Sequence, residues 1–308
     1  MAEPQVLLCG ATGELGSEIA RRLAAAGVPF RALVRKGRAA APLEALGAAI
    51  VHGDLRDESS LVPAVRGVTT VISTVNTMAR LLAGDRDLSI RDVDDRGYAR
   101  LIAACEKAAV QRYVVARLLG DLAAAHTPFT DAKVATEARL RASSMHEVIV
   151  RSDMFQESWF TPIVGFDWTH GKVTVYGKGA TRHAYVAISD VAEAMVRLAL
   201  APDPPREVEI AGPEAISRTE AVEAFERALG RPIRTSHVPR IAMRLGSLLM
   251  RRPRPALASV MGMAQFGDLT ETKVRDDALR ALGITARPVG AYIAEVAGRQ
   301  AAAAVGPD

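Results

Sequence analysis

Residues 5–16 read QVLLCGATGELG, and this stretch decides the fold. A short apolar run ends at Gly10, and Gly13 and Gly16 follow at three-residue steps into an amphipathic segment that ends near Gly27. The pattern predicts a strand, a tight turn and a helix. Glycines let the backbone approach a pyrophosphate closely, and the first N–H groups of a helix attract an anion. This context favours a dinucleotide-binding turn over a glycine-rich turn without a ligand.

Length and composition exclude several classes of protein. The chain has 308 residues, enough for one domain with a sizeable appendage or for two. No apolar run is long enough to span a membrane, and the first expected strand begins too early to leave room for a signal peptide. Cys9 lies in a strand pattern and Cys105 in a helix pattern, which predicts buried thiols and a cytoplasmic protein.

The charge pattern argues against a nucleic-acid partner. The formal net charge is +4, but the basic residues are spread along the chain and no basic patch is interleaved with aromatic residues. We also expect no metal site. A homodimer is left open.

Strand and helix patterns alternate through the first half of the chain. The expected strands are residues 5–9, 30–34, 49–52, 70–74, 112–116 and 147–150. The expected helices are residues 14–26, 43–46, 59–65, 94–108 and 130–142. Such alternation predicts parallel βαβ units and a doubly wound α/β sheet, with a cofactor-binding domain over residues 1–150.

After about residue 150 the alternation ends. We expect residues 151–308 to form a smaller C-terminal α/β substrate region that adds strands to the sheet and finishes in helices. The expected elements are a strand pair at residues 173–176 and 184–188, a helix from Ser189 or Asp190, and a helix that Ser217 and Glu220 cap and Gly230 closes.

The end of the second expected strand indicates which dinucleotide binds. Arg35 stands there, with Lys36 and Arg38 beside it. In a dinucleotide-binding fold this position faces the adenosine ribose, where an acid accepts from the 2′-hydroxyl and a cation favours a 2′-phosphate. Arg35 therefore predicts NADPH/NADP+ as the cofactor. The alternative is a solvated basic loop.

Two further strand ends carry polar residues. Asp54 follows the third strand, where its carboxylate could accept from the adenine amino group while Leu55 packs on the ring. Thr74 and Val75 end the fourth strand, at the edge where ligands bind in open α/β sheets. The Thr74 hydroxyl could reach a cofactor ribose or only cap the strand.

Several motifs together resemble the short-chain dehydrogenase/reductase superfamily, and more narrowly its atypical NmrA-like, isoflavone-reductase-like branch. They are GATGELG at 10–16, LVR at 33–35, GDLRD at 53–57, the stretch 111–157, AISDVAEAM at 187–195, IAGPEAIS at 210–217 and AFERALGRPI at 224–233. The resemblance implies a Rossmann-type fold in which the glycine turn binds pyrophosphate and a basic residue after the second strand selects NADPH.

The chain departs from the superfamily at its catalytic centre. Most members use a Tyr, a Lys four residues later and an upstream Ser, but no Tyr-x-x-x-Lys occurs here. Phe129 stands four residues before Lys133, and Arg117 ends the fifth strand where a Ser is usual. A lone Lys is common in the isoflavone-reductase-like branch. The resemblance thus implies that Lys133 holds the ribose and also polarises or protonates the substrate, directly or through water. The alternative is a surface lysine paired with Glu137.

The expected site residues follow from these arguments. Lys133 is the candidate catalytic residue. The expected cofactor contacts are Gly10, Ala11, Thr12, Gly13, Glu14, Leu15, Gly16, Arg35, Lys36, Asp54, Leu55, Thr74, Val75 and Lys133. The candidate substrate contacts are Arg117, Asp153, Phe155, Gln156 and Trp159. Arg117 could instead pair with Asp121, and the polarity of Asp153 and Gln156 could be that of an ordinary loop.

Three features of the second half stay open. The aromatic residues Phe155, Trp159, Phe160, Phe166 and Trp168 predict either a pocket for a flat apolar ligand or ordinary core packing. Tyr176 and Tyr185 could supply a phenol, although packing on a sheet edge is the simpler interpretation. Residues 241–250 form an apolar helix pattern flanked by arginines. A lid or core packing is favoured there over an oligomer contact or an interfacial membrane helix.

The leading hypothesis is an NADPH-dependent oxidoreductase that reduces a carbonyl or conjugated double bond of a small apolar molecule such as a quinone, polyketide or phenolic. One alternative is a non-catalytic NADP(H)-binding redox sensor, regulator or assembly factor. Another is a non-redox isomerase or cyclase that retains the cofactor site. NADPH consumption with a substrate panel would distinguish the first hypothesis from the other two.

Overall fold

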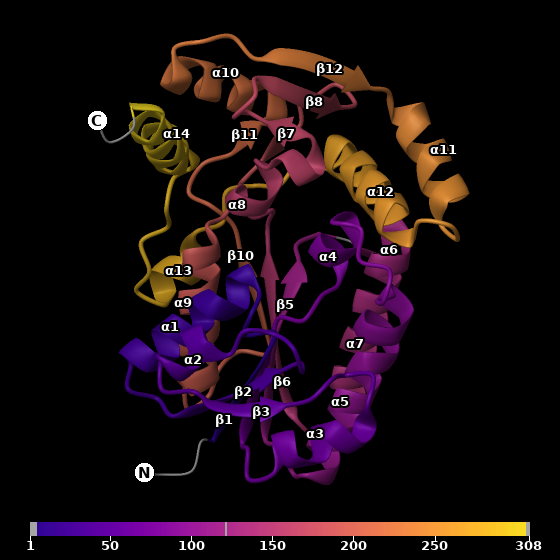
Figure 1. The fold of residues 1–308 in the computed structure, drawn as a ribbon, viewed down its shortest axis with the longest axis vertical. Coiled ribbons are helices and arrows are strands. Elements are labelled where there is room, and N and C mark those ends of the chain that lie inside the picture. The colour runs from indigo at the N-terminus through magenta and orange to yellow at the C-terminus, as the bar shows by residue number, and fades with distance from the viewer. Residues whose placement is uncertain (1–4, 121, 306–308) are drawn as a thin grey trace. The chain divides into compact units, whose positions relative to one another are not determined.

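The computed structural model describes residues 5–120 and 122–305 and divides into two compact units (Figure 1). The first unit comprises the chain up to residue 117 together with 128–151 and 188–209. The second comprises 118–127, 152–187 and the chain from 210 onward. The units interleave along the sequence, because 188–209 return to the first unit. The expected domain boundary at residue 150 stays a prediction.

A seven-stranded sheet forms the centre of the first unit. Its strand order is β10-β6-β5-β4-β1-β2-β3, and the pairs that join β5, β4, β1, β2 and β3 are parallel. The strands are β1 Val6–Cys9, β2 Phe30–Val34, β3 Ala49–His52, β4 Thr70–Ser73, β5 Arg112–Leu118, β6 His146–Ser152 and β10 Glu207–Ile210. The doubly wound α/β fold is thus confirmed. The order reverses between β1 and β4, and ligands bind at the carboxyl ends of strands at such a switch point.

Helices cover both faces of this sheet (Figure 1). α1 (Glu14–Ala25) packs beside α9 (Ile188–Leu200) on one face, and α3 (Glu58–Val65), α5 (Arg96–Lys107) and α7 (Pro128–Ala142) pack along the other. The short helices α2 (Ala41–Glu44) and α4 (Met78–Leu82) lie in connections. All four residues of β1 are buried, as expected for a parallel strand covered on both faces. Cys9 and Cys105 are buried and free, as predicted.

The second unit has its own small sheets and core. β12 (Arg234–Val238), β8 (Lys172–Tyr176) and β7 (Phe166–Asp167) form one sheet, and β11 (Ile216–Ser217) pairs with β9 (Arg182–His183). The helices of this unit are α6 Leu122–Ala125, α8 Gln156–Trp159, the single turn η2 Pro162–Val164, α10 Arg218–Leu229, α11 Arg240–Met250, α12 Pro255–Leu269, α13 Asp277–Ala281 and α14 Val289–Val305. The predicted capping box of α10 is present: Ser217 accepts from the Glu220 N–H and Glu220 accepts from the Ser217 N–H. Gly230 closes the helix in the left-handed conformation.

Two predictions for the second half are wrong. Residues 173–176 and 184–188 do not pair with each other: β8 pairs with β7 and β12, and α9 already begins at Ile188. Short apolar runs do not specify their partner, so periodicity alone could not place 184–188. Core packing of residues 241–250 is also wrong, because Met243 is the one buried residue of α11.

Most of the aromatic cluster packs in the core of the second unit. Phe160 lies 5.0 Å from Phe166 and 4.8 Å from Tyr185 between ring centroids, and Trp168 stacks on Phe225 at 5.1 Å. The indole N–H of Trp168 donates to the Phe160 carbonyl at 3.0 Å. Core packing therefore accounts for Phe160, Phe166 and Trp168.

Candidate functional site

The glycine turn lies at the carboxyl end of β1, where the sheet order reverses. Gly10 has φ +88°, and a Cβ there would lie 2.6 Å from the Thr74 hydroxyl oxygen. A Cβ on Gly16 would lie 2.0 Å from the Gly10 carbonyl oxygen, so only glycine allows α1 to start this close to the turn. Thr12, Gly13 and Glu14 are exposed at the start of α1. The turn therefore presents a helix N-terminus to solvent at the switch point, which suits a pyrophosphate.

A cationic cavity of about 420 Å³ follows the carboxyl ends of β2 and β3. Arg35 and Lys36 come from the segment after β2, and Asp54 and Arg56 come from the segment after β3. Its lining residues are Arg35, Lys36, Arg38, His52, Gly53, Asp54, Arg56, Asp57, Ser60 and Arg80. Five of these are Lys or Arg. We name Arg35, Lys36, Arg38, Arg56 and Arg80 the cation cluster.

The cation cluster is short of compensating negative charge. Asp54 pairs with Arg56 at 2.8 Å, and Arg80 pairs with Asp85. Partial burial raises the pKa of Asp54, but hydrogen bonds from Arg56 outweigh it and hold that pKa below its ordinary value. Desolvation lowers the pKa of Arg35, and repulsion from Arg80 and Arg38 lowers it further. A phosphate dianion among these side chains would relieve that repulsion.

The predicted adenine contacts differ in accessibility. Asp54 is partly exposed at the cavity, whereas Leu55 is buried in the core and packs against Gly97 of α5. Thr74 donates to the carbonyls of Cys9 and Gly10 at 3.4 Å, so its hydroxyl already links β4 to the glycine turn. Ala11 and Leu15 are buried beside the exposed residues of that turn.

Lys133 is buried and lies between Asp94 and the backbone that follows β4. Its Nζ is 3.4 Å from Asp94 Oδ1 and donates to the Val75 carbonyl at 3.4 Å. The alternative of a surface lysine paired with Glu137 is therefore wrong. Burial lowers the pKa of Lys133 to about 8, and Arg117 lowers it as well, whereas Asp94 raises it. An ammonium with a pKa near neutrality can release or hold a proton at ordinary pH.

Asp94 is held by two hydrogen bonds from Thr77. It lies in a π-helical turn, η1 (Arg91–Asp95), and π turns occur often at functional sites. The Thr77 hydroxyl donates to Asp94 Oδ2 at 2.5 Å and the Thr77 N–H donates at 3.2 Å. Both residues are buried. This arrangement keeps the carboxylate facing Lys133.

Two aromatic rings border the Lys133 ammonium. Nζ lies 4.7 Å from the Phe129 ring centroid and 5.1 Å from that of Tyr98. The Tyr98 hydroxyl donates to the Val75 carbonyl at 2.8 Å, next to Ser73 Oγ at 3.1 Å. Burial raises the pKa of Tyr98 well above its ordinary value. Tyr98 therefore helps to pack and hydrogen-bond the site but is poorly suited to donate a proton.

Arg117 belongs to a buried ion-pair network. Its Nε lies 3.4 Å from Glu137 Oε1, and Arg151 donates to Glu137 Oε2 at 2.7 Å. The Arg117 guanidinium also lies 5.9 Å from the Tyr98 ring centroid. Asp121, the alternative partner, lies outside the described residues. Arg117 thus stands where the superfamily has a Ser but is engaged by Glu137.

Trp159 lines a small cavity of the second unit, together with the candidate phenols Tyr176 and Tyr185 and with Arg218. The cavity volume is about 30 Å³, room for about one water molecule. Tyr176 donates to the Val164 carbonyl at 2.9 Å, and burial raises the pKa of Tyr185 to about 12. Neither phenol is prepared for proton transfer.

Asp153 and Phe155 lie in the segment that enters α8, and Gln156 is the first residue of that helix. Asp153 accepts from the Thr272 hydroxyl and, at 2.7 Å, from the Met154 N–H. Phe155 forms an isolated bridge with Val186. Gln156 is fully buried, and its side-chain amide has no hydrogen-bond partner among the residues that the structure describes. The assignment of these residues to substrate stays a prediction.

Sequence reasoning missed four residues of these sites. Arg56 could have been found from the GDLRD motif, which places it two residues after Asp54. Arg80, Thr77 and Asp94 come from the long connection after β4 and from the turn before α5. A strand-and-helix pattern carries no signal for where such segments return to the sheet.

No metal cluster accompanies these side chains. Across residues 5–120 and 122–305, no group of three or more His, Cys, Asp or Glu is placed to hold a metal ion. No helix within the same ranges is long and apolar enough to cross a membrane.

Comparison with known proteins places this arrangement in a family. Residues 2–280 match the model of the NmrA-like family. The photosystem II assembly factor Ycf39 of Synechocystis sp. is 30% identical over 247 residues, 78% of this chain and 72% of that protein. An NAD(P)H azoreductase of Xenophilus azovorans is 28% identical over 232 residues, 74% of this chain and 75% of that protein.

A solved structure shares the fold. The NADPH-dependent quinone oxidoreductase of Escherichia coli, crystallised with NADPH, aligns with a TM-score of 0.73 at 19% identity, over 94% of this chain and 99% of that one. At this identity the likeness concerns the fold alone.

Proposed function

This chain belongs to the NmrA-like family, and from that premise we propose that it is an NADPH-dependent oxidoreductase that reduces a carbonyl or conjugated double bond of a small apolar molecule. A quinone or a phenolic is the substrate class we favour. The reductases among its relatives support oxidoreductase chemistry.

The cation cluster is the observation that carries the cofactor assignment. The cluster lies at the carboxyl ends of β2 and β3, one and two strands away from β1 and its glycine turn. In this fold the adenosine end of a dinucleotide binds at those strand ends. Arg35 is partly buried, and its side chain makes no hydrogen bond or ion pair within the described part of the chain. The 2′-phosphate of NADPH would give Arg35 an anionic partner, and the 2′-hydroxyl of NADH would not.

The Lys133–Asp94 pair supports a role beyond binding. When bound, NADPH supplies the hydride. Lys133 would hold the nicotinamide ribose and stabilise negative charge that develops on the substrate oxygen, in a site sheltered from water. With Phe129 in place of the usual tyrosine, the proton comes from Lys133 or from solvent.

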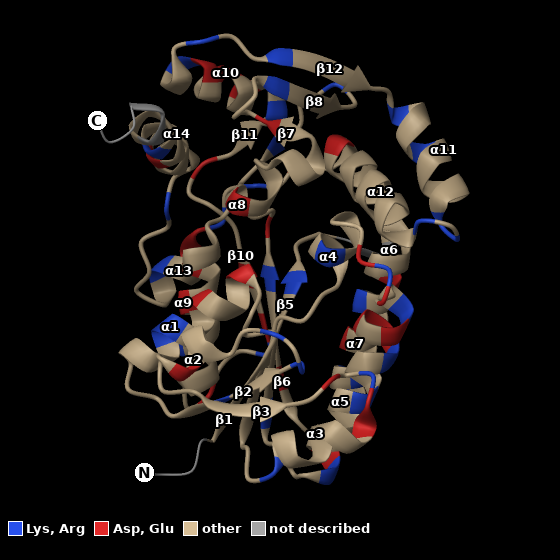
Figure 2. Ribbon diagram, viewed as in Figure 1, with Lys and Arg blue, Asp and Glu red and all other residues tan. Residues whose placement is uncertain are grey.

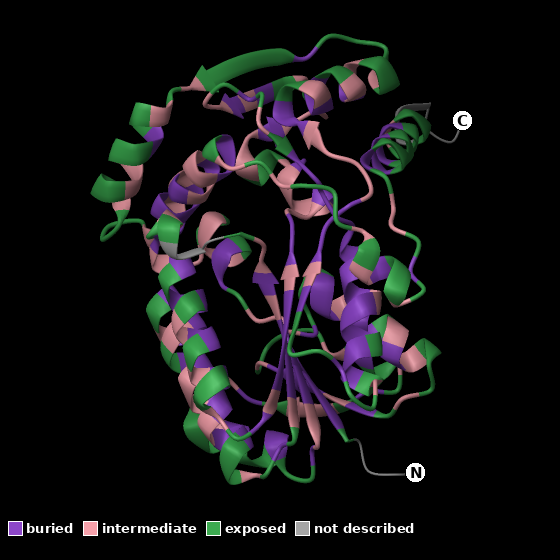
Figure 3. Ribbon diagram, turned by 180° about the vertical axis from the view of Figure 1, so that it is seen from behind, coloured by how far each residue is buried: buried purple, intermediate pink, exposed green. Residues whose placement is uncertain are grey.

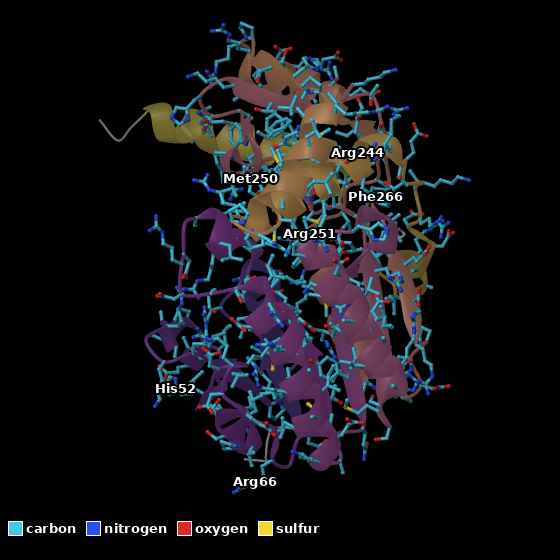
Figure 4. All side chains as sticks on the ribbon, turned by 90° about the vertical axis from the view of Figure 1, so that its right-hand side faces the viewer. His52, Arg66, Arg244, Met250, Arg251 and Phe266 are labelled. Carbon is cyan, nitrogen blue, oxygen red and sulfur yellow. The ribbon has the colours of Figure 1, made fainter. Side chains whose placement is uncertain are left out.

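Calorimetric titration with NADPH, NADP+, NADH and NAD+ tests the cofactor assignment. For Arg35→Asp we expect NADPH affinity to fall roughly 10–150-fold, the equivalent of one charge-assisted hydrogen bond, while NADH affinity is retained. Arg66→Asp is the matched control: Arg66 is exposed after α3 and lies apart from His52, which lines the cavity (Figure 4). Equal losses for NADPH and NADH in Arg35→Asp would refute the phosphate assignment.

Turnover is tested separately. NADPH oxidation is followed with a panel of quinones, azo dyes and enones, and Lys133→Ala is expected to abolish it. The second candidate, an NADP(H)-binding assembly factor without turnover, draws on the likeness to Ycf39 and on the engagement of Arg117 by Glu137 where a catalytic Ser is usual. Tight NADPH binding without NADPH oxidation by any quinone, azo dye or enone of the panel favours the assembly-factor function.

A further inference from the structure

We propose that α11 and its arginine-rich flanks dock this protein onto an anionic lipid surface. α11 is the helix for which the sequence led us to expect a lid or core packing. Its outward face instead carries large apolar side chains, and the surrounding stretch of chain carries positive charge only.

The apolar side chains of α11 form one exposed face. Ile241, Leu245, Leu248 and Leu249 repeat at helical spacing and are 61%, 51%, 63% and 71% exposed. Figure 3 shows α11 as largely exposed along its length. Single exposed leucines are common on protein surfaces. Four large apolar side chains on three turns of one helix form a contiguous apolar patch, and such patches mark binding surfaces.

The opposite face of α11 is held by α12. Met243 is buried, the Ser247 hydroxyl donates to the Ala258 carbonyl at 2.9 Å, and a Cβ on Gly246 would lie 2.5 Å from the Met261 sulfur. The helix is therefore anchored at close range by its small residues. Its outward face is thereby fixed as a surface of the second unit.

The charge around this face has one sign. Between Glu226 and Asp268 the sequence has no acidic residue and eight arginines, Arg227, Arg231, Arg234, Arg240, Arg244, Arg251, Arg252 and Arg254. Figure 2 shows α11 and the turn after it with basic residues and no acidic ones. Asp268 itself is paired with Arg240. Figure 4 labels Arg244 on α11 and Arg251 just beyond its end.

These features together select the partner. A second copy of this chain would bring arginines against arginines, which repel each other. A nucleic acid would use aromatic or polar side chains between the arginines, whereas here the side chains are leucine and isoleucine. A bilayer with anionic headgroups can bind both the apolar face of α11 and the arginines around it. The apolar side chains enter the boundary below the headgroups, and the arginines pair with the lipid phosphates.

Vesicle co-sedimentation tests the proposal. Wild-type protein is mixed with vesicles of phosphatidylcholine alone or with 30 mol% phosphatidylglycerol, at ionic strengths from about 0.05 to 0.5 M. We expect binding to the anionic vesicles only, weakening as salt screens the arginines. Arg244→Ser and Arg252→Ser should each reduce the partition coefficient roughly fivefold at low salt, and Leu248→Ser/Leu249→Ser should reduce it more than tenfold.

Matched control variants distinguish binding through α11 from nonspecific binding of the protein to vesicles. Val62→Ser/Ile163→Ser removes two exposed apolar side chains elsewhere, and Arg66→Ser/Arg91→Ser removes two exposed arginines elsewhere. Neither pair should change binding, and all positions are at the surface, so folding is retained. The proposal is overturned if wild-type protein ignores anionic vesicles or binds neutral ones equally. It is also overturned if the leucine variant binds unchanged, or if that variant instead abolishes a concentration-dependent dimer.

Discussion

At the scale of single residues, the buried Lys133–Asp94 pair sets the chemistry that this site can perform. Desolvation of Lys133 and the charge of Arg117 both favour the neutral amine, whereas Asp94 favours the ammonium. The resulting pKa of about 8 is within the range that experiments on NADPH binding can cover.

We therefore predict that NADPH affinity depends on pH through Lys133. The ammonium donates stronger, charge-assisted hydrogen bonds to a ribose than the neutral amine does, so affinity should fall as pH rises through about 8. Asp94→Asn removes the group that raises the pKa of Lys133. The midpoint of the pH dependence of NADPH affinity should therefore move to lower pH. The measurement is the NADPH dissociation constant by fluorescence between about pH 6.5 and 9.5.

Asp95→Asn is the neighbouring control for this prediction, because Asp95 pairs with Arg139 at the protein surface at 2.6 Å. Its midpoint should equal that of the wild type, and Lys133→Ala should show no midpoint at all. A wild-type affinity that is flat across this pH range would contradict the role of Lys133 in cofactor binding.

Arg80 provides a second prediction at this scale. It lines the cationic cavity and lowers the pKa of Arg35 through repulsion, but it also pairs with Asp85. Arg80→Ala should weaken NADPH binding about 3–10-fold, less than loss of Arg35, and leave NADH binding unchanged. Arg91→Ala, which changes an exposed arginine outside the cavity, is the comparison. A loss shared by both dinucleotides would mean that Arg80 acts through α4 and not on the phosphate.

Sequence could place a residue where its position along a strand decides where its side chain lies, whereas the predicted cofactor contacts themselves stay predictions. Arg35 and Asp54 could be placed at the cavity because each follows a strand whose end is visible in the pattern. Asp94 could not be paired with Lys133, because their segments are separated by α5, β5 and α6 and meet only through the sheet topology. The nearest pair by sequence, Lys133 and Glu137, was accordingly the wrong one.

At the scale of elements, the junction between β1 and α1 depends on how closely backbones approach. A Cβ at Gly16 would collide with the Gly10 carbonyl at 2.0 Å, whereas a Cβ at Gly13 would meet the same oxygen at 3.4 Å, an ordinary contact. Both glycines belong to one motif, yet their surroundings differ.

We predict that Gly16→Ala is destabilising and Gly13→Ala is not. Gly16→Ala must shift α1 away from the turn, which should lower the free energy of unfolding by about 1–3 kcal/mol or more. Gly13→Ala should cost less than about 1 kcal/mol, mainly through the weaker N-cap propensity of alanine. Urea unfolding followed by circular dichroism measures both. Similar losses in the two variants would show that the tight approach at Gly16 is not what limits this junction.

Elements could be predicted best where local signals agree. β2, β3 and the capped helix α10 lie where the pattern placed them, because alternation, caps and glycine punctuation all specify the same bounds. Residues 184–188 lack such agreement: they form an apolar run without a periodicity that selects strand or helix. α4 has five residues and lies in a connection, which leaves little pattern to read.

At the scale of the whole molecule, the alternating patterns predict the parallel architecture but carry no signal for the return of residues 188–209 to the first unit. Alternating patterns specify parallel βαβ units, whose connections are right-handed. They do not fix where the strand order reverses, which the structure places between β1 and β4. Residues 188–209 return to the first unit through contacts of α9 with α1. Those contacts join parts of the chain that are far apart in sequence, and no local sequence pattern predicts them.

Binding of NADPH should be visible in the stability of the molecule. A ligand that binds only the folded state raises its unfolding free energy by about 2.7 kcal/mol at a concentration one hundred times the dissociation constant. For a folded unit of this size that corresponds to a rise in Tm of roughly 5–10 °C. We expect this rise with NADPH, a smaller one with NADH at equal concentration, and at most about half of it with NADPH for Arg35→Asp, whose affinity is reduced roughly 10–150-fold.

Differential scanning calorimetry distinguishes this effect from nonspecific stabilisation by anions. Inorganic phosphate at the same concentration as NADPH should raise Tm far less, because it can occupy the cation cluster but cannot engage the glycine turn at the same time. Arg66→Asp should respond to NADPH as the wild type does. Equal shifts from phosphate and from NADPH would mean that the cation cluster binds phosphate alone, and the dinucleotide assignment would then have to be abandoned.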